Sequence, residues 1–109
     1  MERIYNKLVR DKIPNIITEN GETPIVKILD EIQYKNELEN KLYEEYKEVI
    51  ESTGENRLEE LADMLEVIRA LASLENKSLD DVIAIAESKN IKRGAFYEKI
   101  FLEKVIETE

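Results

Sequence analysis

Two pairs of acidic residues on either side of a turn have the types and spacing of a metal site. Glu45 and Glu48 precede a turn at Gly54. Glu60 and Asp63 follow the turn at matching distances. Residues three positions apart share one face of a helix, so an antiparallel helical hairpin would bring the two pairs to similar heights. Four converging carboxylates need a neutralising cation, and ligation by oxygen alone suits Mg²⁺ or Mn²⁺.

An acidic helix surface facing solvent explains the same residues. The chain has 25 acidic residues among 109, so this spacing arises easily by chance. Runs of charge are usually solvated faces of helices. The four residues alone leave both interpretations open.

Basic residues near the end of an expected helix form a second candidate set. Lys89, Lys92 and Arg93 lie within about one helical turn and could reach the oxygens of a polyphosphate. Cations at a helix C-terminus also favour the helix dipole, which explains them equally well. The same two interpretations apply to the N-terminal cations Lys7, Arg10 and Lys12.

The composition excludes several kinds of chemistry. The chain has no cysteine and no histidine, which excludes disulfides, thiolate nucleophiles and Ser-His arrangements. Hydrolysis would therefore depend on carboxylates, lysines or a metal-activated water. The net charge of −9 argues against a nucleic-acid polymer as partner, because its phosphates would be repelled.

Length and hydropathy predict one domain over residues 1–109. No stretch resembles a signal peptide, and none reaches the roughly 18 apolar residues of a membrane span. We therefore expect no membrane partner and a cytoplasmic location. A protomer this short would leave helix faces uncovered, which favours a homodimer or homotetramer.

The periodicity of apolar residues predicts a mainly all-α fold, a helical bundle centred on an antiparallel acidic hairpin. We expect a short helix that ends at Glu19, and a long helix that begins after Asp30 and runs to about Ser52. Gly54 is expected to stop that helix, and Asn56 to cap the next.

The remaining elements are a fourth helix and two short strands. Ser78 and Asp81 resemble a capping box that opens a helix ending near Gly94. Residues 25–29 (IVKIL) and 100–106 (IFLEKVI) are rich in β-branched residues and predict two strands that pair with each other.

The order of the motifs resembles a known superfamily. The blocks EEYKE at 44–48 and EELAD at 59–63 resemble the EExxE and ExxD motifs of the all-α nucleotide pyrophosphohydrolases, which include MazG, the dimeric dUTPases and phosphoribosyl-ATP pyrophosphohydrolase. The opening YNKLVRDKIPNII and the closing KNIKRGAFYEKIFL resemble a branch of small MazG-like proteins. The resemblance extends from Tyr5 to about Leu102.

This resemblance implies roles for particular residues. The metal ligands of the family fall on Glu45, Glu48, Glu60 and Asp63, and Mg²⁺ is the implied cofactor. Glu44 matches the first acid of EExxE, where it would orient or activate a water, and Lys89 and Arg93 match positions that contact phosphate. True phosphoribosyl-ATP pyrophosphohydrolases lack the YNKLVRDKIP block, which leaves that substrate in doubt.

We therefore expect hydrolysis of a nucleoside triphosphate to the monophosphate and pyrophosphate, in the cleaning of nucleotide pools. The water would be oriented or deprotonated by a catalytic glutamate, for which the candidates are Glu44, Glu45 and Glu48. The basic residues would balance charge on the leaving pyrophosphate. The alternatives are a phosphoribosyl-ATP pyrophosphohydrolase of histidine biosynthesis and a non-catalytic acidic helical module that binds a basic partner or a structural ion.

Overall fold

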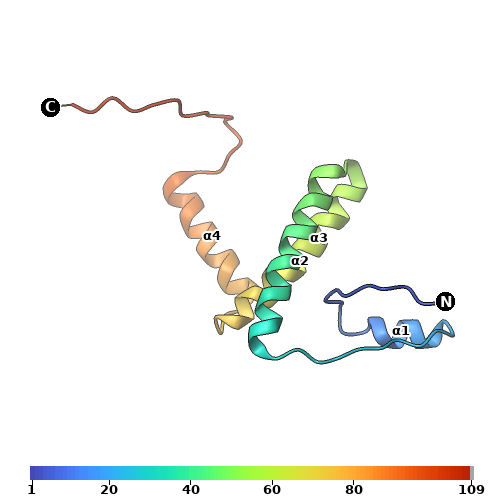
Figure 1. The fold of residues 1–109 in the computed structure, drawn as a ribbon. Coiled ribbons are helices and arrows are strands. Elements are labelled where there is room, and N and C mark those ends of the chain that lie inside the picture. The colour runs from blue at the N-terminus through green and yellow to red at the C-terminus, as the bar shows by residue number, and fades with distance from the viewer. Residues whose placement is uncertain (109) are drawn as a thin grey trace.

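The computed structural model describes residues 1–108 and contains four helices (Figure 1). In chain order they are α1 (Ile13–Glu19), α2 (Glu31–Glu51), α3 (Gly54–Leu74) and α4 (Leu79–Arg93). No strand occurs in the described part of the chain. The prediction of an all-α fold is confirmed.

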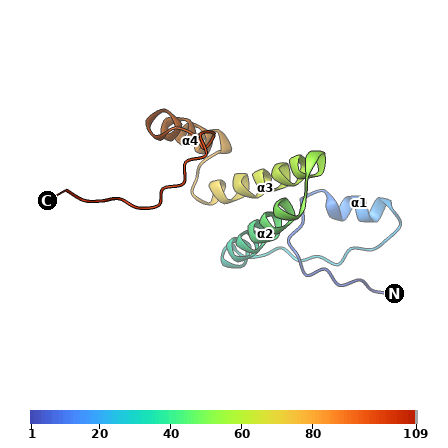
Figure 2. The ribbon, with the colours of Figure 1, turned by 90° about the horizontal axis from the view of Figure 1, so that it is seen from above.

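Helices α2 and α3 form the antiparallel hairpin on which the fold is built (Figures 1 and 2). Leu38 and Val49 on α2 are buried, as are Val67 and Ala72 on α3. Leu38 and Val49 are eleven residues apart, which is about three turns, so they lie on one side of α2. The interface of the hairpin is therefore the main hydrophobic core.

Side-chain caps fix where two of the helices begin. The backbone N–H of Gln33 donates to the side chain of Asp30 at 2.8 Å, and the Asp30 N–H donates back to Gln33. Ser78 and Asp81 make the same reciprocal pair at the start of α4. Each pair satisfies N–H groups that have no partner within the helix. The capping box predicted at Ser78 is confirmed.

The turn of the hairpin is tighter than the sequence suggested. Gly54 was expected to stop the second helix and Asn56 to cap the third, but α2 ends at Glu51 and Thr53 is the N-cap of α3. Ser52 and Thr53 are extended, and they reverse the chain before Gly54 begins α3 with a φ of +61°. That left-handed conformation favours glycine, which explains its position there.

The two predicted strands are absent, and this prediction was wrong. Residues 25–29 and 100–106 are extended but unpaired. A strand needs a partner for its backbone N–H and C=O groups. Figure 1 places residues 25–29 just before the lower end of α2 and residues 100–106 beyond the upper end of α4, so neither is within reach of the other.

The outer helices are attached loosely to the hairpin. Helix α4 packs on α3, where Leu79 is buried, and then diverges from the hairpin (Figure 1). Within residues 1–108, α1 packs on none of the other helices. Among those four helices, none combines the length and the apolar character needed to cross a lipid bilayer.

The cap of α4 gives a first prediction. Replacing Ser78 with Ala removes the acceptor for the Asp81 N–H and should lower the free energy of unfolding by about 1 kcal/mol. Ser88→Ala makes the same change at an exposed position inside α4 and should alter the free energy of unfolding by less than about 0.5 kcal/mol. Urea titration followed by circular dichroism measures both. Equal effects would show that the cap does not stabilise α4.

Candidate metal centre

The four predicted carboxylates converge between α2 and α3. Glu45, Glu60 and Asp63 each contribute one oxygen, and these three oxygens lie within 4.8 Å of one another. The near match of Glu45 and Asp63, and of Glu48 and Glu60, in distance from Gly54 explains why two facing helices bring them together. The donor set is entirely oxygen, which fits a hard divalent cation.

Glu45 is the most confined of these acids. Its side chain is on the inner face of α2, and the residue is 6% exposed. The pKa of Glu45 is raised to about 7, and burial is the largest cause. The charge of Glu48, a hydrogen bond with Glu48 and the charge of Asp63 raise this pKa further. Lys41 acts in the opposite direction. At neutral pH the carboxyl therefore holds a proton for part of the time.

Glu60 is linked to the same group of acids from α3. The pKa of Glu60 is raised, first by a side-chain hydrogen bond with Glu48 and then by burial. One oxygen of Glu45 and one of Glu60 are buried with no hydrogen-bond partner in residues 1–108. These two oxygens could thus accept a cation, because no group in the described chain donates a hydrogen bond to them.

Two N-terminal cations contact this cluster from outside. The Nη2 atom of Arg10 lies 2.7 Å from Oδ1 of Asp63, and Nζ of Lys7 lies 2.7 Å from Oε1 of Glu44. Arg10 and Lys7 thus attach the N-terminal segment to α3 and α2 respectively. All four side chains are partly exposed, and ion pairs of this kind are individually weak.

Glu44 is held by two lysines rather than facing the other acids. Lys7 lies 2.7 Å from one of its oxygens and Lys41 lies 3.2 Å from the other. The hydrogen bond from Lys7 is the largest cause that lowers the pKa of Glu44. A carboxylate stabilised in this way is a weak base, so these contacts favour a positioning role for Glu44 over proton abstraction.

A shallow hollow adjoins these lysines. Its volume is about 330 Å³, and it lies between the N-terminal segment and α2. Lys7, Lys41 and Lys47 line it together with Tyr43 and Glu44. The Nζ atom of Lys47 lies 5.5 Å from the centre of the Tyr43 ring. The sequence made Tyr43 one of several candidates for stacking on a base, but it did not assign Lys41 or Lys47 to a site, although Lys47 follows Tyr43 by one helical turn.

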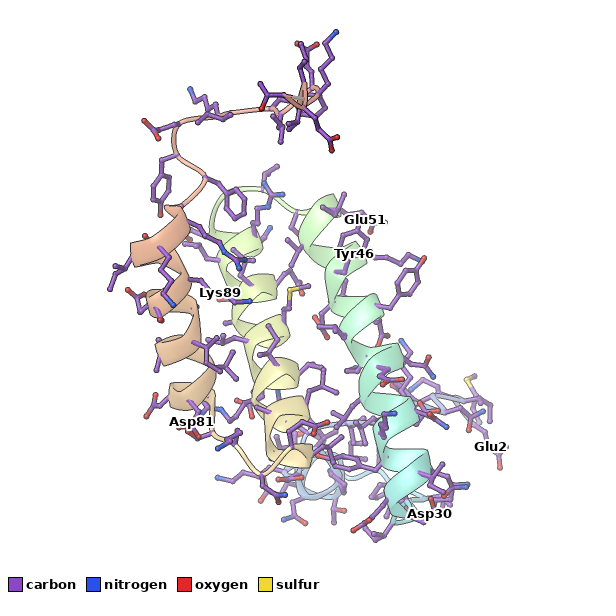
Figure 3. The ribbon with its side chains drawn as sticks, turned by 90° about the vertical axis from the view of Figure 1, so that its left-hand side faces the viewer. Glu2, Asp30, Tyr46, Glu51, Asp81 and Lys89 are labelled. Atoms are coloured by element: carbon purple, nitrogen blue, oxygen red, sulfur yellow. The ribbon has the colours of Figure 1, made fainter. Side chains whose placement is uncertain are left out.

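The other predicted cations are not brought to the acids by any contact. Lys89, Lys92 and Arg93 are exposed near the end of α4, and no ion pair within residues 1–108 includes them. Figure 3 shows α3 between Lys89 on α4 and Tyr46 on α2. Lys12 is exposed directly before α1 and is likewise outside these pairs. Their phosphate-binding role stays a prediction.

Comparisons of the chain with models of protein families, with curated proteins and with solved structures gave no match. The resemblance to the nucleotide pyrophosphohydrolases therefore stays a prediction from the motifs.

The raised pKa of Glu45 predicts a pH dependence of stability without metal. The folded chain binds more protons than the unfolded chain between the ordinary value of 4.5 and about 7. Its free energy of unfolding should therefore fall as pH rises through that window and level off above it. Glu45→Gln should remove part of this decrease, on the order of 2 kcal/mol.

Urea titrations with chelator from pH 4.5 to 8 measure this effect. Glu39→Gln is the matched control, because Glu39 is an exposed residue of the same helix. The control should keep the pH dependence of the wild type. An unchanged slope in Glu45→Gln would mean that Glu45 does not titrate as its surroundings imply.

Proposed function

We propose that this protein is a metal-dependent nucleotide pyrophosphohydrolase that converts a nucleoside triphosphate to the monophosphate and pyrophosphate. The observation that carries the proposal is the pair of buried, unpartnered oxygens of Glu45 and Glu60 beside Asp63. Buried polar atoms in proteins nearly always have partners, and a bound cation would supply one for these oxygens. The ordered EExxE and ExxD motifs supply the chemical class.

The residues present fit a magnesium ion. Glu45, Glu60 and Asp63 would hold it, and Glu48 is close enough to Glu45 and Glu60 to complete the set. When bound, Mg²⁺ or Mn²⁺ supplies Lewis-acid polarisation of phosphate oxygens and makes a water more acidic. Ligation requires ionised carboxylates, so binding should displace the proton that Glu45 holds for part of the time near neutral pH.

The chain's own cations would position the phosphates. Lys7 and Arg10 already lie beside the acidic cluster, and their pairs with Glu44 and Asp63 are exposed enough to exchange. Their ammonium and guanidinium groups would then bind phosphate oxygens and balance charge on the leaving pyrophosphate. Glu44 would hold Lys7 in place, and Glu48 would orient the attacking water.

The hollow beside these residues suits the remainder of a nucleotide. Lys41 and Lys47 add positive charge there, and the Tyr43 ring is exposed for stacking on a base. We further propose that the protein acts in the cytoplasm as a homodimer or homotetramer. The motifs and the exposed apolar surface of the protomer support this assembly.

The decisive experiment is pyrophosphate release from a panel of standard and modified nucleoside triphosphates and phosphoribosyl-ATP, with Mg²⁺ and with chelator. Chelator-sensitive release from triphosphates is the expected result. A strong preference for phosphoribosyl-ATP would assign the chain to histidine biosynthesis instead. No release by the folded protein from any member would overturn the proposal and favour a non-catalytic binding module.

Removal of single ligands should abolish turnover without unfolding the chain. Asp63→Asn and Glu48→Gln each keep the shape of the side chain but remove its charge. Each should lower metal-dependent turnover at least about 100-fold, which is roughly 3 kcal/mol of transition-state stabilisation. Glu59→Gln, at an exposed position next to Glu60, should keep activity. Wild-type turnover in either variant would remove that residue from the mechanism.

Arg10 should affect metal binding and turnover in opposite directions. Arg10→Gln removes a cation that competes for Asp63, so Mn²⁺ should bind about two- to fivefold more tightly. Turnover should fall, because a phosphate contact is lost. Arg3→Gln is the matched control, since Arg3 pairs with Glu22 at the same 2.7 Å on the surface.

Calorimetric titration with Mn²⁺ and pyrophosphate release measure the two effects. Arg3→Gln should change neither quantity. Weaker Mn²⁺ binding in Arg10→Gln would show that Arg10 supports the site structurally and does not compete with the cation.

A further inference from the structure

Two extended segments carry apolar side chains that nothing in the chain covers. Ile25 is 92% exposed and Ile28 is 94% exposed in residues 25–29. Phe101 is 87% exposed in residues 100–106, here called the C-terminal arm. Exposed apolar residues are normal when scattered, but contiguous ones mark interaction surfaces.

The backbones of both segments are also free. In the part of the chain that the structure describes, no backbone hydrogen bond involves residues 25–29 or the C-terminal arm. An extended apolar segment with open N–H and C=O groups is a template for another strand. Each segment therefore has the properties of half of a β-pair.

The side-chain patterns of the two segments are complementary. Alternate residues of a strand lie on one face, so Lys27 is between Ile25 and Leu29 on one face of the first segment. Glu103 is between Phe101 and Val105 in the C-terminal arm. Pairing Lys27 with Glu103 aligns opposite charges at the centre and apolar pairs on both sides, whether the strands run parallel or antiparallel.

A single chain cannot make this pairing in its observed fold. In Figure 1 the C-terminal arm lies at the upper left, beyond the end of α4, whereas residues 25–29 lie at the bottom, before the start of α2, in a molecule whose longest extent is 68 Å. The arm points away from the hairpin instead of folding back onto it (Figure 1). A pairing of these two segments therefore requires a second chain.

The exposed area of the protomer matches what a stable dimer needs. Its accessible surface is 10485 Å², whereas a compact monomer of 12.7 kDa exposes about 6,200 Å². The radius of gyration is 19.1 Å, against about 13 Å for a compact chain of this length. The surplus of about 4,000 Å² on each protomer is more than enough for the roughly 1,000–2,500 Å² that each partner buries in an obligate dimer.

We propose that the C-terminal arm of one copy pairs as a β-strand with residues 25–29 of a second copy, in a reciprocal exchange between two chains. Each chain gives one arm and receives one, which closes the assembly as a symmetric dimer. The inference does not depend on metal binding or catalysis, because neither segment contains a residue of the acidic cluster. It also explains why both segments are apolar and yet uncovered in the protomer.

Cross-linking of single-cysteine variants tests the pairing directly, since the chain has no cysteine of its own. Tagged Lys27→Cys is mixed with untagged Glu103→Cys, and a short bismaleimide is added. We expect a covalent dimer that contains one chain of each kind. Lys35→Cys places the same substitution on exposed α2 and should give little product with Glu103→Cys.

Sedimentation equilibrium tests the energetic role of the arm. The wild type should sediment at twice 12.7 kDa or at a multiple of it. Phe101→Asp should raise the dimer dissociation constant at least about tenfold, because a buried apolar side chain is worth more than that factor. Lys104→Asp adds the same side chain to the other face of the arm and should have a smaller effect.

Circular dichroism should show unchanged helix content in these variants, because the arm packs on no helix of its own chain. A monomeric wild type at micromolar concentration would overturn the proposal and leave the arm to a different protein. Wild-type association of Phe101→Asp would also overturn it, as would equal cross-linking of Lys27→Cys and Lys35→Cys. Pyrophosphate release by a monomeric protein would reject the exchange and leave the enzymatic function intact.

Discussion

Glu45 places a carboxylate oxygen between α2 and α3, where no group in residues 1–108 donates a hydrogen bond to it. Burial and the neighbouring acids oppose its ionisation, as the raised pKa shows. A buried acid in this position contributes nothing to folding that an apolar residue would not supply better. The hairpin therefore carries a local destabilisation of the kind expected at functional sites, which a bound cation would relieve.

The remainder of the chain has little core with which to offset that cost. Only five apolar residues of the described chain are buried, four of them in the hairpin and one at the start of α4. Helix caps and the tight turn fix the lengths and the register of α2 and α3, but they do not cover their outer faces. Ligands or other chains that bind the folded state would add stability, since any such binding shifts the equilibrium towards it.

Local sequence patterns predicted those features of the fold that depend on interactions between residues close in the chain. The helices follow from the periodicity of apolar residues. The start of α4 follows from the capping box of Ser78 and Asp81, which are three residues apart. Convergence of the acids followed from matching distances on two facing helices. The positions of Lys7 and Arg10 could not be predicted, because they depend on how a non-helical segment crosses the hairpin. The strands failed for the related reason that pairing depends on a distant partner, which periodicity does not reveal.

Side-chain cations and a small metal ion would reach different oxygens of the acidic cluster. Arg10 and Lys7 reach only the exposed acids at the border, Asp63 and Glu44. A guanidinium is planar and broad, and a lysine brings a hydrated ammonium group, so neither is suited to the buried space beside the unpartnered oxygens of Glu45 and Glu60. A small ion has no such restriction. The side-chain cations thus lower the repulsion at the edge of the cluster, while the buried oxygens of Glu45 and Glu60 have no counter-ion among the described residues.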